Sequence, residues 1–349
     1  MDIMSMSIEQ LGQRLTEMGQ PKYRAKQLYA WMHVRLAASY GEMTDQPKAL
    51  RERLEEELPL TVPQKVVMLE SGTDGTRKYL FRLADGNVIE SVWMKYHHGN
   101  SVCISSQVGC RMGCSFCAST IGGLVRSLEP SEMLGQIYAI TRDTGERVDN
   151  VVVMGTGEPL DNYDNVLIFL RMLTDENGLH ISQRNVTIST CGLVPNLRRL
   201  ADEKLAITAA ISLHAPNDEL RKKLMPVANS YSVKELMEAA DYYVKTTGRR
   251  ITFEYSLIDG VNDSASCARE LAALLRGRNC HVNLIPVNPV RERNYRRSLV
   301  TNVLQFQKML ENEGINVTIR RELGSDIDAA CGQLRRHYEA GIGAEGGEE

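Results

Sequence analysis

The chain has 349 residues, of which 43% are hydrophobic and 24% charged, and its formal net charge is −3. This length and hydrophobic fraction suit one large α/β domain or two smaller ones with a sizeable buried core. The net charge excludes a globally basic nucleic-acid-binding protein, so contacts with nucleic acid must come from local basic patches. The sequence has no secretory signal pattern at its start and no apolar run of the roughly 18 residues that a membrane span requires. We therefore expect a cytoplasmic protein with no membrane partner.

Residues 1–62 are predicted to form a helical accessory domain. Helical patterns occur in SIEQLGQRLTEMG, PKYRAKQLYAWMHVRLA and PKALRERLEEEL. Residues 63–99 then change to short alternating runs, KVVMLES, RKYLFRLA and NVIESVWMKY, which are separated by Asp-Gly pairs. Asp-Gly is typical of hairpin turns, so these runs predict a small antiparallel sheet that leads into the core.

Strand patterns alternate with helical patterns over residues 100–337. The predicted strands lie in SVCISSQ, NVVVMG, NVTIST, AITAAISL, RRITFEYSLI, CHVNLIPV and INVTIRRE. Repeated β-α units indicate a parallel sheet, and this number of units favours a partial or complete barrel. An open doubly wound sheet is the alternative. The Gly/Glu-rich tail at 338–349 is predicted to be disordered.

Four of the eight cysteines lie in the stretch CISSQVGCRMGCSFCAST. Cys110, Cys114 and Cys117 have the spacing C-x-x-x-C-x-x-C, and Gly109 and Gly113 allow the loop a tight path. In a reducing compartment such a cluster favours metal ligands over disulfides. Three thiolates suit zinc or an iron–sulfur cluster, but the sequence has no second ligand pair of the kind that closes a structural zinc site. The spacing therefore favours a four-iron cluster with one iron open to substrate or cofactor.

This cysteine motif, placed after the first strand of a β/α repeat, resembles the radical S-adenosylmethionine (SAM) superfamily. Five collinear segments narrow the resemblance to the RNA adenine methyltransferases of the RlmN and Cfr family: CISSQVGCRMGCSFCAST, MGTGEPLDNYDNV, ISLHAPNDELRKKLMP, VNLIPVNP and GSDIDAACGQL. The similarity runs from about residue 5 to residue 337. It implies an α/β fold with a partial (β/α)6 barrel, a [4Fe–4S] cluster on the three cysteines, and two SAM molecules per turnover.

Several residues at or just after the C-terminal ends of predicted strands are implied SAM contacts. Taken singly, each is as easily explained as a turn, a cap or a buried polar group. Their shared position, however, is where β/α barrels bind ligands. The resemblance gives this role to Gly157, Glu158, Ser189, Ser212, Leu213, His214 and Asn288.

Three further residues receive catalytic roles from the resemblance. It implies that one SAM methylates Cys331, that a 5′-deoxyadenosyl radical from a second SAM activates this methyl group, and that the carbon radical adds to adenine. Cys103 would resolve the covalent enzyme–RNA adduct through a disulfide with Cys331, and Glu90 would accept a proton. Strand alternation separates Cys103 from Val102 and Ile104 and directs it toward the face from which the cysteine loop departs. An isolated cysteine is otherwise most often a small buried hydrophobe.

Two basic segments are candidate RNA contacts, and the second should lie beside the active site because it follows a strand end. They contain Lys22, Arg24 and Lys26, and Arg291, Arg293, Tyr295, Arg296 and Arg297. The resemblance implies methylation of adenine C2 in 23S rRNA, at the peptidyl transferase centre, and in tRNA. It also implies a flavodoxin- or ferredoxin-type electron donor and a monomeric enzyme.

Two alternatives remain open. The segment WMKYHHGNSVCISSQ is similar to relatives that methylate C8 of the same adenine, whereas NLIPVNPVRERNYRRS is more similar to the C2 branch. The alternative from another class is a non-catalytic RNA-binding protein that zinc stabilises.

Overall fold

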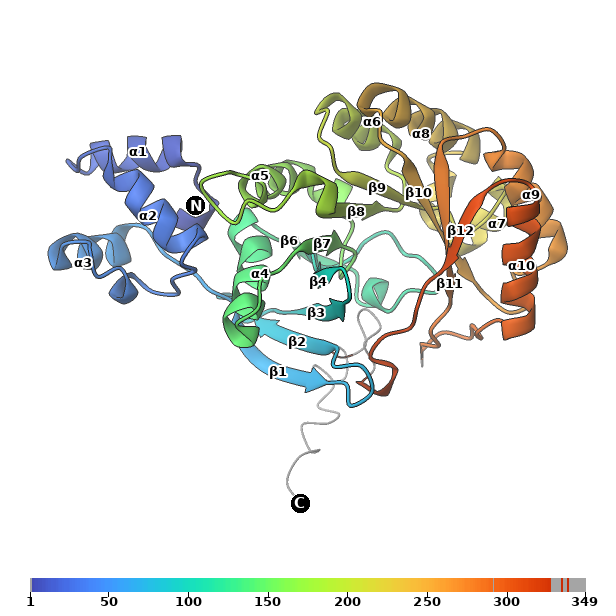
Figure 1. Cartoon of the computed structure of the whole chain (residues 1–349), viewed down its shortest axis with the longest axis horizontal. Helices are drawn as coiled ribbons and strands as arrows, with labels where there is room; N and C mark the ends of the chain where they lie inside the picture. Colours follow the sequence, from blue (N-terminus) through green and yellow to red (C-terminus); the bar gives the residue numbers. More distant parts are fainter. Residues whose placement is uncertain (1, 291, 328–333, 335–337, 339–349) are drawn as a thin grey trace, which may run out of the picture.

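The computed structural model describes residues 2–290, 292–327, 334 and 338 (Figure 1). Cys331, Arg291 and nearly all of the tail predicted at 338–349 lie outside the described residues. In the part of the chain that is described, no helix has the length and apolar character needed to cross a membrane.

Three helices form the N-terminal part and gather at one end of the molecule (Figure 1). They are α1 (Ile8–Glu17), α2 (Arg24–His33) and α3 (Lys48–Glu57), with 3-10 segments at Ile3–Ser5 and Tyr40–Glu42. Ser7 and Gln10 form a capping box that fixes the start of α1. The Nδ1 atom of His33 lies 2.7 Å from the hydroxyl of Tyr138, which joins these helices to the core. The predicted helices are therefore confirmed.

Ten strands form one continuous sheet in the order β1-β2-β3-β4-β7-β8-β9-β10-β11-β12. Strands β1 to β4 pair antiparallel, and from β4 onward every pair is parallel. The strands are β1 (Gln64–Glu70), β2 (Arg77–Arg82), β3 (Val88–Tyr96), β4 (Gly99–Ile104), β7 (Asn150–Val153), β8 (Val186–Thr190), β9 (Thr208–Ser212), β10 (Ile251–Leu257), β11 (Cys280–Pro286) and β12 (Asn316–Ile319). The predicted antiparallel strands thus continue the parallel sheet, because β3 pairs with β4.

The strand order confirms the α/β partial barrel. Parallel neighbours follow one another along the chain without the reversal of order that a doubly wound sheet requires, so the crossover helices cover one face (Figure 1). The barrel is open because β1 and β12 are its unpaired edges. The covering helices are α4 (Pro130–Thr144), α5 (Tyr163–Leu173), α6 (Val194–Asp202), α8 (Val233–Thr247), α9 (Ala265–Leu275) and α10 (Val300–Asn312).

Shorter elements shape the end of the barrel where the parallel strands finish. The ribbon of β5 (Gln107–Gly109) and β6 (Leu124–Ser127) closes the cysteine loop, and the helix α7 (Asp218–Leu224) follows β9. The 3-10 segments of this part of the chain are Ala118–Thr120, Pro159–Asn162, Pro226–Asn229 and Ser325–Ile327. A further one, Gln183–Asn185, lies at the opposite end because it directly precedes β8.

Alternation along β4 sorts its side chains between two environments. Val102 and Ile104 are fully buried in the main hydrophobic core under the helices. Cys103 packs instead with Val92 and Met94 in a separate small cluster on the inner face. The predicted orientation of Cys103 is therefore confirmed, and the inner face of the sheet is left to the functional site.

Candidate cluster and cofactor site

The three cysteines of the loop line one cavity of about 140 Å³ at the C-terminal ends of the parallel strands. Cys110 and Cys114 are buried and Cys117 is half-buried. Main-chain bonds hold the loop in place: the N–H of Cys110 donates to the carbonyl of Gly123, and the N–H of Ser115 to that of Leu224 at the end of α7. The loop is therefore a fixed wall of the cavity.

The donor set of three thiols fits a polynuclear cluster. Among the residues that the structure describes, no three or more His, Cys, Asp or Glu side chains are arranged to hold one metal ion. The ligands of a four-iron cluster bind different irons, so they must surround a cavity and not converge on one point. Burial, followed by the charges of neighbouring groups, raises the pKa of Cys110 to about 12 and raises that of Cys114 further. Such thiolates require a positively charged centre, which iron supplies.

Glu158 is a buried carboxylate in the same cavity. Its Oε1 accepts from the N–H of Leu160 at 3.0 Å, and its Oε2 accepts from the N–H of Cys191 at 2.7 Å. Burial raises its pKa, while these hydrogen bonds favour the ionised form. Residue type alone suggests a solvated glutamate in a turn, but the structure buries this side chain. A fixed buried carboxylate of this kind can bind an ammonium group.

Gly157 allows the close approach of two loops beside Glu158. Its φ is +113°, and a Cβ atom at this position would lie 2.6 Å from Cβ of Gln107 and 2.8 Å from the Gln107 nitrogen. The side chain of Gln107 accepts from the N–H of Glu158 at 2.9 Å. Only glycine fits this position without moving the backbone that holds Glu158.

His214 presents a neutral imidazole to the cavity. Its Nδ1 accepts from the N–H of Ser256 at 2.9 Å, so the ring proton of the neutral form is on Nε2. Burial lowers its pKa to about 3. Its left-handed backbone, with φ of 56°, is held by buried Asn262, which donates to the His214 carbonyl at 2.8 Å. The ring packs edge to face on Phe116 of the cysteine loop, with centroids 4.9 Å apart.

The remaining implied SAM contacts are divided between locations. Ser189 and Ser212 line the same cavity, and their hydroxyl oxygens are 3.4 Å apart. The side chain of Leu213 is buried in the main core, and its N–H donates to the carbonyl of Glu254. Asn288 does not line this cavity and lies in a neighbouring one. The structure therefore brings five of the seven residues together around the thiols.

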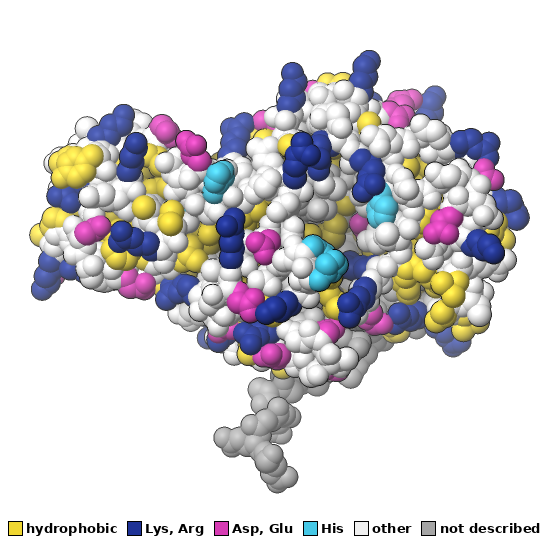
Figure 2. Space-filling model, viewed as in Figure 1, with side chains coloured by type: hydrophobic (Ala, Val, Ile, Leu, Met, Phe, Trp, Pro, Cys, Tyr) yellow, Lys and Arg dark blue, Asp and Glu magenta, His cyan; other side chains and the backbone are white. Residues whose placement is uncertain are grey.

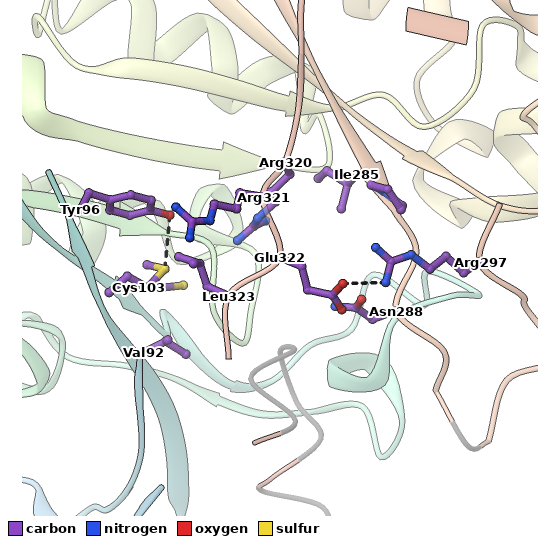
Figure 3. Close-up of a pocket in the computed structure, with 12 residues that line it drawn as sticks. Val92, Tyr96, Cys103, Ile285, Asn288, Arg297, Arg320, Arg321, Glu322 and Leu323 are labelled. Atoms are coloured by element: carbon purple, nitrogen blue, oxygen red, sulfur yellow. Dashed lines mark hydrogen bonds and ion pairs between the residues drawn. The ribbon is translucent and has the colours of Figure 1, made fainter. Parts of the chain in front are cut away.

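Cys103 and Asn288 line the second cavity, also about 140 Å³, together with Arg297, Arg320 and Arg321 (Figure 3). Arg297 forms an ion pair with Glu322 at 2.7 Å. The two cavities are neighbours, since Met154 lines the first and packs against the small hydrophobic cluster that contains Cys103.

Glu90 is buried on the inner face and forms an ion pair with Lys78 of β2, with Nζ and Oε2 3.3 Å apart. It shares its face of β3 with Val92, which packs against Cys103. Glu90 is therefore not a solvated strand carboxylate, which is the usual environment of a glutamate in a strand. Sequence reasoning missed Lys78, and its one signal was a lysine at an inward position of a hydrophobic strand.

The loop after β11 packs against the cysteine loop, as its position after a strand predicted. The hydroxyls of Tyr295 and Ser115 are 2.8 Å apart, and Arg293 donates to the hydroxyl of Thr120 at 3.1 Å. The other basic segment is remote from these cavities, in the N-terminal helices, where Lys22 and Lys26 are exposed.

Comparison with known proteins identifies the class of enzyme to which this chain belongs. The radical SAM superfamily matches residues 104–268, and the ribosomal RNA large subunit methyltransferase N-terminal domain matches residues 1–59. The fold and these matches define a radical SAM enzyme, which uses a [4Fe–4S] cluster and SAM.

Full-length relatives narrow the class. Proteins named "Probable dual-specificity RNA methyltransferase RlmN" from Lachnoclostridium phytofermentans and Lachnospira eligens are each 60% identical over 337 residues, covering 97% of this chain and 95% and 96% of theirs. A solved radical SAM methyltransferase from Sphaerobacter thermophilus is 46% identical, with a TM-score of 0.92 over 95% of this chain and 98% of that one. The chain belongs to the RlmN family of radical SAM RNA methyltransferases. It is an enzyme that acts on RNA, which sets aside the non-catalytic zinc-stabilised alternative.

Replacing Gly157 should weaken SAM binding and destabilise the fold. In Gly157→Ala the new Cβ must displace the Gln107 backbone, so we expect a loss of about 2 kcal/mol in the free energy of unfolding and roughly tenfold weaker SAM binding. Gly145→Ala is the matched control, since Gly145 has φ of +67° with no atom within 4 Å of the added Cβ. It should lose only about 1 kcal/mol. Urea unfolding measures the change in the free energy of unfolding, and equilibrium dialysis measures the affinity for SAM. Equal effects of the substitutions at Gly157 and Gly145 would contradict the steric argument.

The buried histidine should make stability depend on pH. Because His214 has a pKa of about 3 when folded and 6.5 when unfolded, its contribution is complete above the unfolded pKa and is lost as pH falls toward 3. In His214→Gln the slope of unfolding free energy against pH, measured on the apo-protein between about pH 7 and about pH 5, should decrease by up to about 1.4 kcal/mol per unit. His180→Gln, at an exposed position, should leave the slope unchanged. An unchanged slope in His214→Gln would disprove the assignment.

Proposed function

We propose that this enzyme methylates C2 of adenine in 23S rRNA and in tRNA, through an S-methylcysteine at Cys331 and a covalent enzyme–RNA adduct. The observation that carries the proposal is the adjacency of two cavities across Met154, one lined by the three thiols and the other by Cys103. A reactive group formed in the cavity of the three thiols would therefore lie close to the proposed resolving cysteine, inside the barrel.

Cys110, Cys114 and Cys117 would hold the cluster, which supplies the electron for reductive cleavage of SAM when bound. Glu158 would accept hydrogen bonds from the SAM ammonium group, since its carboxylate is fixed by main-chain donors. The hydroxyls of Ser189 and Ser212, and the Nε2–H of His214, line the rest of this cavity. Leu213 would contribute through its main chain, and Asn288 from the neighbouring cavity.

The second cavity is suited to RNA. Arg297, Arg320 and Arg321 line this cavity together with one carboxylate, Glu322, which pairs with Arg297 (Figure 3). The excess positive charge beside Cys103 would attract phosphate groups of a bound nucleotide. The visible surface elsewhere mixes Lys and Arg with Asp and Glu (Figure 2). The positive charge is therefore concentrated in local patches and is not spread over the whole surface. The match of residues 1–59 to an rRNA methyltransferase domain supports RNA binding by α1 to α3.

Glu90 and Cys103 would complete the reaction. The radical adduct would pass its unpaired electron to the external one-electron carrier as Glu90 takes the proton from C2, which leaves a closed-shell adduct. Lys78 would balance the charge of Glu90 in the buried site. The Cys103 thiolate would then attack the sulfur of Cys331, so that an S–S bond forms as the bond between sulfur and the transferred carbon breaks. The electron pair released to that carbon takes up a proton and leaves a methyl group on adenine. A thiol reductant would restore both cysteines, and an external flavodoxin- or ferredoxin-type protein would supply electrons.

Regiochemistry can be tested on cellular rRNA. In cells that lack the family's own enzyme, expression of this chain should produce 2-methyladenosine in 23S rRNA and in tRNA, detected by mass spectrometry of nucleoside digests. The Cys110→Ala variant should produce none, because it lacks one cluster ligand. Detection of 8-methyladenosine in place of 2-methyladenosine would show that the enzyme methylates C8, and would contradict the proposal.

Loss of the resolving thiol should trap the adduct. Cys103→Ala should retain RNA covalently bound through Cys331 after a single turnover, visible as a protein–RNA band on denaturing gels. Cys267→Ala should release methylated RNA normally, since Cys267 is buried on α9 and lines neither cavity. Normal turnover by Cys103→Ala would disprove the resolving role of Cys103. As a control, the double variant Cys103→Ala/Cys331→Ala should give no protein–RNA band.

A further inference from the structure

Arg221 is a fully buried cation beside the cysteine loop. It lies in α7 with an exposed fraction of 0%, whereas the adjacent Lys222 and Lys223 are exposed. A guanidinium group cannot lose its proton in a protein, so this charge persists in the interior. Burying an unbalanced charge is costly, and a fold retains one only where an anion compensates it.

The described contacts of Arg221 do not neutralise its charge. Its Nη2 donates to the carbonyls of Cys191 at 2.6 Å and Ser212 at 3.3 Å, and its Nε donates to that of Leu213 at 3.2 Å. All three acceptors are main-chain groups. Its Nη1 is buried without a hydrogen-bond partner among the residues that the structure describes. The carbonyls fix the orientation of the guanidinium but do not neutralise it. The Asp218 carboxylate of the same helix attracts this charge without forming an ion pair with it.

The cysteine loop lies directly against this helix. Cys114 belongs to the same small hydrophobic cluster as Leu224 and Met225 at the end of α7. The N–H of Ser115 donates to the carbonyl of Leu224 at 2.9 Å.

The main chain of Cys191 separates the two buried charges near the cavity. Its N–H donates to the Glu158 carboxylate at 2.7 Å, and its carbonyl accepts from Arg221. Glu158 lines the cavity and Arg221 lies behind it, next to the ligand loop. The carboxylate is therefore available to a cationic cofactor, and the guanidinium is left to compensate the thiolates.

We propose that Arg221 is a positioning residue that balances the charge of the cluster and raises its reduction potential. The proposal rests on the cluster assigned above to Cys110, Cys114 and Cys117. A [4Fe–4S]²⁺ core on three thiolates has one net negative charge, and it has two after an external one-electron donor reduces it. No bond forms or breaks in this step. A fixed positive charge stabilises the doubly negative state more, which makes reduction easier.

The test is a redox titration of the reconstituted enzyme without RNA, followed by the electron paramagnetic resonance signal of the reduced cluster. In Arg221→Gln the ratio of reduced to oxidised cluster at a fixed potential should fall at least tenfold, which is 59 mV for one electron. Arg221→Lys retains the charge and should stay within about threefold of the wild type. Lys222→Gln removes an equal charge from the exposed face of the same helix and should leave the ratio unchanged.

Two results would overturn the proposal: an unchanged ratio in Arg221→Gln, or an equal fall in Arg221→Lys. If Arg221→Gln fails to retain iron, retention by Arg221→Lys supports the requirement for charge, whereas loss in both variants shows that hydrogen bonding alone matters and rejects it. A wild-type protein without about four irons per chain would instead reject the cluster assignment. Regiochemistry at adenine does not enter the measurement.

Discussion

The burial of three thiols around one cavity is the constraint on which the site depends. A thiol is buried easily when it is neutral, but a metal cluster requires thiolates, and burial raises the pKa of Cys110 and Cys114. Under the proposal made above for Arg221, the surrounding fold compensates with fixed dipoles and with this permanent cation. The ends of β8 and β9 hold that cation through their carbonyls, so the ligand loop and the strand ends act as one unit.

The second organising feature is a pair of small neighbouring cavities that the described residues line in the barrel interior. Met154 lies between them, with the thiols on one side and Cys103 on the other. Under the proposed function, SAM is cleaved in one cavity and the nucleotide binds in the other. The two reaction sites are thus separate but remain neighbours. The buried pair of Lys78 and Glu90 extends the second region toward the antiparallel strands, and under the proposed function this part of the sheet takes part in the chemistry.

Much of the fold is predictable from local patterns. Alternation and Asp-Gly turns define β1 to β3, and the side-chain period of two is sufficient to place Cys103 opposite Val102 and Ile104. The choice between a barrel and a doubly wound sheet is not local, because it depends on strand order. The continuity of the antiparallel and parallel strands likewise follows from the pairing of β3 with β4, which no single segment specifies.

The sequence by itself determined the family and predicted the cluster ligands. Cys110, Cys114 and Cys117 lie within eight residues, so their spacing alone limits what they can bind. Only the tertiary structure decided that Glu158 is buried and that Arg221 is an interior cation, although its segment DELRKKL has the composition of an exposed helix. The reason is physical: burial and charge compensation depend on elements distant in sequence, which meet only when the strands have assembled.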